Sequence, residues 1–313
     1  MDFESRVLPE LRSTLAVLPQ LNLPYDLENF RNFPIPECEK SPDVAIKNLM
    51  IAGPASELLI KIYEPANRMD KNLPSLLWIH GGGYVLGHPD SDDALCERFV
   101  VEANCVVVSV DYRLAPEHPY PAAIEDCYAA LKWMADSAVE LNIDITRIAI
   151  AGASAGGGLT AALSLMARDK GGPAISFQMP LYPMIDDRNL SVSSHEITTN
   201  NSVWNRTNNV AAWSLYLGEL SGGDISQYAA PSRAESYLGL PPTYTCVGQL
   251  DPFRDETIEY VSRLAEAGID VEFHLYPGCF HAFELAVPKA EVSLRASKGY
   301  VDALNRALNH QVK

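Results

Sequence analysis

Short apolar runs alternate with helix-like patterns along most of the chain. From about residue 44 onward, runs of strand length recur at intervals that leave room for a helix or a long connection between them. They span residues 58–63, 76–80, 106–112, 148–152, 175–180, 244–248 and 271–276. Such alternation favours a mainly parallel sheet, because parallel neighbours need a long crossover between them. The pattern therefore predicts an α/β fold.

Apolar residues spaced three or four positions apart indicate helices between these strands. Such spacings occur around residues 127–134, 159–166 and 301–308. Each spacing would place one apolar helix face against a sheet. We therefore expect helices on both faces of the sheet.

Two segments depart from this alternation. Residues 3–18 carry apolar side chains at helical spacing, which predicts one amphipathic helix before the Pro-rich stretch 19–42. Residues 186–226 are rich in Asn, Ser and Thr and turn helical around 213–217. We interpret the chain as a single α/β domain over 1–313, with a cap from about 1–42 and 186–226 over the edge of the sheet.

The charge of the chain limits its partners. The formal net charge is −16, so no nucleic acid partner is expected, because phosphate binding relies on clustered Lys and Arg. The same charge favours a small neutral substrate over an anionic one. No apolar run approaches the ~20 residues of a membrane span, and the first residues lack the order of a secretion signal. We expect a cytoplasmic protein.

The cysteines show no metal-ligand spacing and are too sparse for a disulfide framework. We expect most of them to be reduced core residues. The six are Cys38, Cys96, Cys105, Cys127, Cys246 and Cys279.

A candidate nucleophile lies between a predicted strand and a predicted helix. Gly152-Ala153-Ser154-Ala155-Gly156 follows the apolar run 147–151 and has the G-x-S-x-G form of a nucleophile elbow. Small neighbours suit this strained turn, because bulky ones would clash. The helix that follows directs unpaired N–H groups towards developing negative charge. A turn of small residues without chemistry is the alternative for this motif taken alone.

A glycine run after the strand at 76–80 predicts an oxyanion hole. Three consecutive glycines follow His80, and they let the backbone approach a substrate closely. The N–H groups of Gly81 and Gly82 would join that of Ala155 around the substrate carbonyl oxygen. His80 itself is expected to brace the loop and not to transfer protons.

The order of the chain selects the acid and the base. After an elbow of this kind, the acid should come before the histidine, each at the end of a later strand. Asp251 follows the run 244–248, and His281 lies in a turn-rich loop after the last strand. We expect His281 to deprotonate Ser154 while Asp251 orients the imidazole. Asp255 is the nearest rival acid, but it falls within the next helix pattern.

The motifs together resemble the hormone-sensitive-lipase-like branch of the α/β-hydrolase esterases. The resemblance rests on residues 80–83, 111–117 and 152–157 and on the loops that carry Asp251 and His281. It implies an eight-stranded, mostly parallel sheet, a helical cap, and hydrolysis of esters with short to medium acyl chains without a metal or cofactor. It also implies that Arg113 pairs with acidic groups to hold the oxyanion loop.

The chain departs from that family pattern at three positions. Ala153 stands where many members carry Asp, Tyr84 stands where Phe is common, and Ala282 stands where Gly is usual. No reacting group is lost, but Ala153 removes a hydrogen-bonding partner beside the elbow. The catalytic interpretation is unaffected, whereas substrate preference is less well specified.

Four aromatic residues near the motifs or in the cap are candidates for substrate contact: Tyr84, Tyr182, Trp204 and Trp213. Packing in the core is the alternative for each. An amidase or formamidase with the same catalytic groups, and a non-catalytic ligand receptor on this fold, are the rival functions. The receptor is disfavoured, because all three catalytic candidates are present. Assembly into a homo-oligomer is left open.

Overall fold

The computed structural model describes residues 3–35, 39–68, 72–199 and 202–310. Within these residues, eight strands form one sheet in the order β1-β2-β4-β3-β5-β6-β7-β8. β1 and β2 pair antiparallel, as do β2 and β4, and the other pairs are parallel. The predicted α/β fold is confirmed. The strands are β1 (Val44–Ala52), β2 (Glu57–Pro65), β3 (Leu73–Ile79), β4 (Val106–Val110), β5 (Ile143–Ala153), β6 (Phe177–Leu181), β7 (Thr243–Leu250) and β8 (Val271–Phe280).

Strand β1 has no counterpart among the predicted apolar runs. It pairs with β2 along its whole length, but most of its residues are exposed or half-buried, including Leu49 and Met50. An edge strand that leaves both faces partly in solvent needs no continuous apolar run. Its pairing with β2 therefore comes from backbone hydrogen bonds more than from burial.

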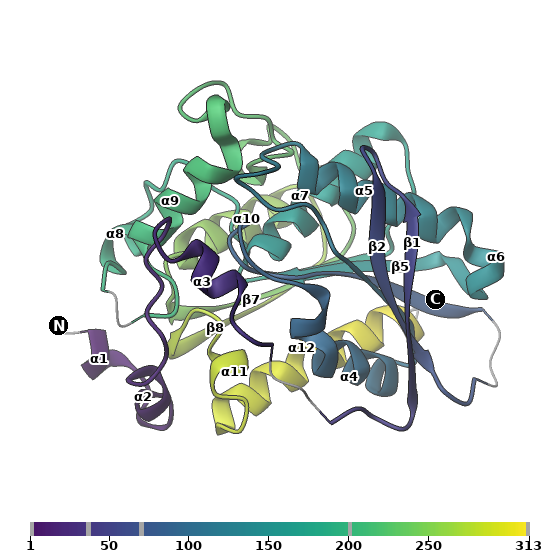
Figure 1. Ribbon diagram of the computed structural model, residues 1–313, viewed down its shortest axis with the longest axis horizontal. Helices are drawn as coiled ribbons and strands as arrows, with labels where there is room; N and C mark the ends of the chain where they lie inside the picture. The colour runs from purple at the N-terminus through teal and green to yellow at the C-terminus, as the bar shows by residue number, and fades with distance from the viewer. Residues whose placement is uncertain (1–2, 36–38, 69–71, 200–201, 311–313) are drawn as a thin grey trace.

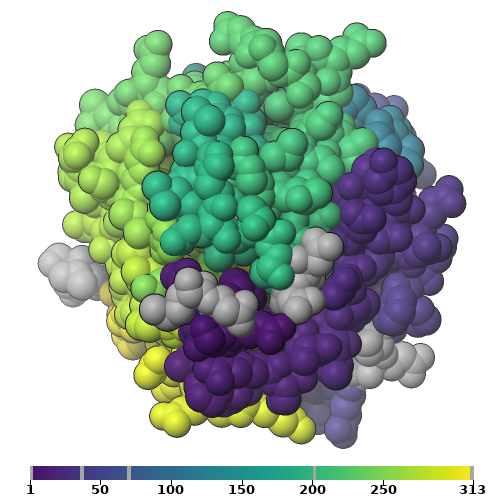
Figure 2. Space-filling view, turned by 90° about the vertical axis from the view of Figure 1, so that its left-hand side faces the viewer, coloured from purple at the N-terminus to yellow at the C-terminus, as the bar shows by residue number. Residues whose placement is uncertain are grey.

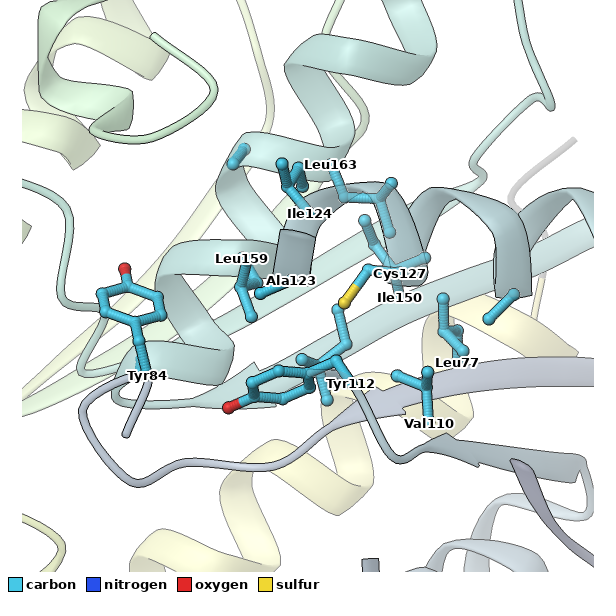
Figure 3. Close-up of a cluster of buried hydrophobic side chains, with 14 of the residues drawn as sticks. Leu77, Tyr84, Val110, Tyr112, Ala123, Ile124, Cys127, Ile150, Leu159 and Leu163 are labelled. Atoms are coloured by element: carbon cyan, nitrogen blue, oxygen red, sulfur yellow. The ribbon is translucent and has the colours of Figure 1, made fainter. Parts of the chain in front are cut away.

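Helices cover both faces of the sheet (Figure 1). Along β3, Leu77 and Ile79 face the cluster formed with α5 (Ala122–Asp136) and α7 (Ala155–Lys170). Leu76 and Trp78 face the opposite cluster, formed with α4 (Asp93–Ala103) and α12 (Glu291–Asn309). Figure 3 shows side chains of β3, β4 and β5 meeting those of α5 and α7. This alternation is what a strand buried on both faces requires.

The N-terminal segment forms two short helices, so the predicted single helix over 3–18 is wrong. α1 (Phe3–Arg6) ends before Pro9, which begins α2 (Pro9–Leu15). Proline has no N–H to donate within a helix and is tolerated in its first turn. The apolar side chains of this segment are nevertheless buried: Leu11 and Leu15 pack into the hydrophobic cluster that contains α12.

The N-terminal segment lies beside the segment that interrupts the strand alternation. The side chain of Asn208 in α9 accepts a hydrogen bond from the Leu23 N–H (2.9 Å) and donates one to the Leu21 carbonyl (2.8 Å). Figure 2 shows the two segments next to one another on one face of the molecule. The remaining elements are α3 (Leu27–Arg31), α6 (Ala138–Leu141), α8 (Val192–Glu196), α9 (Arg206–Leu217), α10 (Arg254–Glu266), α11 (Phe283–Ala286), and the 3-10 turns η1 (Pro89–Asp92), η2 (Gly218–Leu220) and η3 (Pro231–Arg233).

The 111–117 motif joins the glycine loop to helix α5. Arg113 makes a two-pronged ion pair with the buried Asp126 of α5, with both N–O distances 2.8 Å. The glycine loop itself is held by its neighbours in the motif: Tyr112 Oη donates to the His80 carbonyl (2.9 Å), and the Ala115 N–H donates to the Tyr84 carbonyl (3.0 Å). Arg113 therefore anchors the motif, and the motif holds the loop.

None of the helices in the described part of the chain is long and apolar enough to cross a membrane. Five cysteines are buried and form no disulfide, which agrees with the expected core role. The sixth, Cys38, lies outside the described residues.

Removing the Arg113 side chain should destabilise the fold. Arg113→Ala leaves the Asp126 carboxylate, which is 2% exposed, without its cation, and breaking a buried pair costs about 3 kcal/mol. Arg98→Ala is the matched control, because its pair with Glu102 is solvent-exposed and should contribute about 0.5 kcal/mol or less. Urea unfolding of both variants tests this, and equal losses would contradict the anchoring role.

Candidate active site

Ser154 lies at a sharp turn between β5 and α7. Its backbone angles are φ 58° and ψ −117°, a region that residues other than glycine rarely adopt. The turn is held by the Ser154 N–H, which donates to the Leu181 carbonyl (2.9 Å), and by the Met184 N–H, which donates to the Ser154 carbonyl (3.0 Å). A Cβ atom on Gly156 would overlap the carbonyl oxygens that end β3. Glycine at this position therefore lets α7 approach the sheet closely.

Three side chains from separate loops form a hydrogen-bonded row. The His281 Nε2 atom is 3.0 Å from Ser154 Oγ, and the His281 Nδ1 atom is 2.7 Å from Asp251 Oδ2. The second oxygen of Asp251 accepts from the Phe253 N–H (2.8 Å). All three side chains are buried. The carboxylate and the hydroxyl thus occupy the two ring nitrogens of one imidazole, which is the arrangement that activates a serine.

The segment before His281 differs from the prediction. We expected a turn-rich loop after residue 276, but β8 continues to Phe280, and His281 follows the strand directly. Pro277 and Gly278 are tolerated because the β7 ladder is irregular near its end. The imidazole is therefore positioned by the end of a sheet strand.

A buried carboxyl group that the sequence analysis did not single out lies next to the imidazole. Glu284 in α11 accepts a hydrogen bond from Tyr182 Oη (2.6 Å), and the Tyr182 ring meets the His281 ring edge-on at 5.0 Å. Burial raises the pKa of Glu284. No pattern pointed to Glu284, because its partner Tyr182, which directly follows β6, is distant in the chain. The rival acid Asp255 instead pairs with Arg254 in α10 (2.7 Å).

The glycine loop lies against the serine turn. A Cβ atom on Gly81 would be 3.6 Å from the Ser154 Cβ, and Gly82 has a positive φ of 116° that favours glycine. Among the described residues, none accepts a hydrogen bond from the N–H of Gly81 or Gly82. Ala155 is the first residue of α7, so its N–H has no partner within the helix. These three N–H groups come from segments that meet at Ser154.

His80 is part of the support for this loop. Its ring is stacked on Tyr112 with centroids 4.2 Å apart, and its Nδ1 atom is 2.8 Å from the Gly81 carbonyl oxygen. Burial lowers the pKa of His80 to about 4. The ring is therefore neutral at neutral pH.

A cavity of about 430 Å³ opens beside Ser154 and His281. Of the four aromatic candidates, Tyr182 and Trp204 line it. Tyr84 and Trp213 are instead packed together in the core, where Tyr84 Oη donates to the Met184 carbonyl (2.7 Å). Sequence reasoning did not identify several larger apolar side chains of the wall, because they are far apart in the chain: Leu18, Leu21, Phe30, Leu86, Val203 and Leu285.

The sheet and the site together define a class of protein. A parallel sheet with a strand-serine-helix turn, a later acid and a later histidine is the arrangement of a serine hydrolase with the α/β-hydrolase fold. In the described residues, no group of three His, Cys, Asp or Glu side chains is placed to hold a metal ion.

Comparison with known proteins identifies the family. Residues 76–285 match a family model described as alpha/beta hydrolase fold. Esterase LipI of Mycobacterium tuberculosis is 41% identical over 253 residues, which are 80% of this chain and 78% of that protein. Carboxylesterase NlhH of the same organism is 39% identical over 265 residues, 81% of this chain and 80% of that protein. The structure of a bacterial heroin esterase is 39% identical, with a TM-score of 0.91, and the match covers 98% of this chain and 100% of that one.

The chain therefore belongs to the α/β-hydrolase fold family, in its hormone-sensitive-lipase-like branch, and is a serine carboxylic-ester hydrolase.

The neutral state of His80 should appear in the pH dependence of stability. The unfolded chain protonates this histidine near pH 6.5 and the folded chain near pH 4, so protonation favours unfolding as the pH falls through this window. Between pH 7 and pH 5, the free energy of unfolding of the wild type should fall by about 2 kcal/mol more than that of His80→Asn. Urea unfolding at both pH values measures the difference, with His310→Asn, an exposed histidine, as control. Parallel losses in wild type and His80→Asn would contradict the prediction.

Proposed function

We propose that this protein hydrolyses small esters with short to medium acyl chains through an acyl-enzyme formed on Ser154. The observation that carries the proposal is the hydrogen-bonded row of Ser154, His281 and Asp251 at the wall of a cavity. Beside it lie backbone N–H groups that have no hydrogen-bond partner in the described part of the chain. Each of these groups has a defined task in acyl transfer.

In the first half of the reaction, Ser154 Oγ attacks the ester carbonyl carbon while His281 Nε2 takes the hydroxyl proton. Negative charge develops on the carbonyl oxygen and is stabilised by the N–H groups of Gly81, Gly82 and Ala155. The carbon–oxygen bond then breaks, and the alkoxide leaves as an alcohol with the proton from His281. Asp251 holds the ring so that Nε2 faces the serine and stabilises the imidazolium.

In the second half, water takes the place of the alcohol. His281 removes a proton from the water as it attacks the acyl carbon, and the same N–H groups stabilise the second oxyanion. The bond between the acyl carbon and Ser154 Oγ breaks, Ser154 recovers its proton from His281, and the carboxylic acid leaves. No group outside the chain is consumed except water.

The cavity supports a small substrate. Its volume of about 430 Å³ lies near the lower end of the ~300–1,000 Å³ range of small-molecule pockets. Apolar side chains dominate its wall, so alkyl groups of the ester would be buried there at a gain of about 0.8 kcal/mol per CH₂. A long acyl chain would exceed this space.

Residues from about 1–42 and 186–226 are proposed to form a cap over the site. Both segments contribute to the cavity wall, through Leu18 and Phe30 from the first and Trp204 from the second. They are joined by the hydrogen bonds of Asn208. A cap built from two distant segments would set substrate size while the sheet loops supply the chemistry.

A cytoplasmic location is part of the proposal. The five cysteines of the described residues are buried and form no disulfide, which supports the cytoplasmic location that the sequence predicts, because disulfides are rare in that compartment. The proposed reaction uses groups of one chain.

Ser154→Ala should abolish turnover. We expect p-nitrophenyl esters from acetate to dodecanoate to be hydrolysed fastest at the shorter lengths, with kcat lower by roughly 10³–10⁶ in the variant, because the nucleophile is lost. Ser297→Ala, at a half-buried serine of α12 that does not line the cavity, is the matched control and should keep wild-type rates. Wild-type turnover of a p-nitroanilide but of no ester would favour the amidase. Tight ligand binding without turnover would favour the receptor.

The limit on acyl-chain length should rise when the Trp204 side chain is made smaller. The Trp204 indole lines the cavity and packs against Gly83, so Trp204→Leu enlarges the space beside the serine. Relative to acetate, kcat/KM for octanoate should rise about tenfold, since each newly accommodated CH₂ contributes about 0.8 kcal/mol. Trp133→Leu, at a half-buried tryptophan of α5 outside the cavity wall, is the control. An unchanged length profile in Trp204→Leu would contradict the prediction.

A further inference from the structure

We propose that Asp92 makes the cavity selective for esters that carry a protonated amine. The inference rests on the proposed function, since it assigns a substrate class to the same site. Asp92 is the last residue of η1 and lines the cavity that contains Ser154 and His281. The residue as a whole is half-buried.

The hydrogen bonds of Asp92 leave one carboxylate oxygen available. Oδ2 accepts from the indole Nε1 of Trp78 (2.7 Å), whereas Oδ1 has no hydrogen-bond partner among the described residues. The neighbouring carboxylates, in contrast, each have a cationic partner. Asp90 and Asp93 both pair with Lys61, at 2.5 and 2.6 Å. Asp92 is therefore the member of this acidic group that faces the cavity without a cation.

The usual structural role for an aspartate at this position is not fulfilled. Asp92 is the N-cap residue of α4, where a carboxylate normally accepts a hydrogen bond from the N–H two or three residues later. The Asp92 side chain makes no such bond. Capping therefore does not account for a carboxylate here, and the indole of Trp78 needs an acceptor but not a negative charge.

The charge of Asp92 is not compensated within the cavity. The described residues of the wall include no lysine or arginine, and His80, which also lines it, is neutral because burial lowers its pKa to about 4. Burial raises the pKa of Asp92 to about 6, so the carboxylate is ionised at neutral pH. A partly buried anion without a partner is costly, and a cation supplied by the substrate would remove this cost.

The rest of the wall suits the uncharged part of such a substrate. The rings of Phe30, Tyr182 and Trp204 line the same cavity, and aromatic side chains offer apolar surface to a ligand. A substrate with a protonated amine would place the amine against Asp92 and its apolar part against these rings. A hydroxyl group could donate to Oδ1 but would leave the negative charge uncompensated, so the amine is favoured.

Two pairs of matched esters test the assignment. 2-(Dimethylamino)ethyl acetate and its neutral isostere 3-methylbutyl acetate differ in the alcohol part, whereas ethyl 4-(dimethylamino)butanoate and ethyl 5-methylhexanoate differ in the acyl part. Acid release at pH 7.5 gives kcat/KM for each ester with wild type, Asp92→Asn and Asp90→Asn. Asn keeps an acceptor for the Trp78 indole. Asp90→Asn removes the same charge from a carboxylate that does not line this cavity.

In at least one pair, the wild type should prefer the amine ester by about tenfold or more. Asp92→Asn should lower the ratio of amine to neutral ester by roughly 10- to 100-fold, the range for a hydrogen bond to a charged group. Asp90→Asn should keep the wild-type ratio. Equal ratios in wild type and Asp92→Asn, or a wild-type preference for the neutral ester in both pairs, would overturn the proposal.

Failure of the proposed function gives a different result, namely no hydrolysis of any of the four esters by the wild type. If Asp92→Asn does not fold, competition with the wild type decides. N,N-Dimethylbutylamine, which is protonated at pH 7.5, should inhibit hydrolysis of 3-methylbutyl acetate at a concentration about tenfold lower than the neutral 4-methylpentan-1-ol. Equal inhibition by the two compounds would overturn the proposal.

Discussion

The strained backbone of Ser154 is the constraint on which the site depends. The chain passes from β5 into α7 through one residue with a positive φ, and hydrogen bonds to the segment after β6 hold it there. Gly156 is needed because a side chain at that position would displace the end of β3. The same close packing presents the hydroxyl above the sheet and brings the glycine loop beside it. Strain at the serine is thus offset by the packing of the surrounding sheet.

The polar side chains around the serine are buried, and each makes at least one hydrogen bond to a neighbouring group. Asp251 is held by the backbone and by the imidazole, and Glu284 is held by Tyr182. His80 stays neutral under the glycine loop. Fixed hydrogen bonds and burial therefore set the orientation of these groups.

Much of the fold and of the candidate site was predictable from the sequence. Residues 76–80, 106–112 and 148–152 are short apolar runs that lie in the centre of the sheet, where burial on both faces demands such runs. Edge strand β1 was missed because it is mostly exposed, and the N-terminal helix was predicted too long because Pro9 divides it. The prediction of aromatic contacts was mixed: Tyr182 and Trp204 line the cavity, but Tyr84 and Trp213 lie in the core.

By itself, the sequence determined which groups are proposed to carry the chemistry, because the serine elbow, the glycine run and the order of acid and histidine are local patterns tied to strand ends. The tertiary structure decided what surrounds them. Phe30, Asp92 and Leu285 meet in one cavity, although they are distant in the chain. Neither the partner of a buried carboxylate nor the wall of a cavity has a sequence period, since both arise from packing between elements that fold from separate parts of the chain.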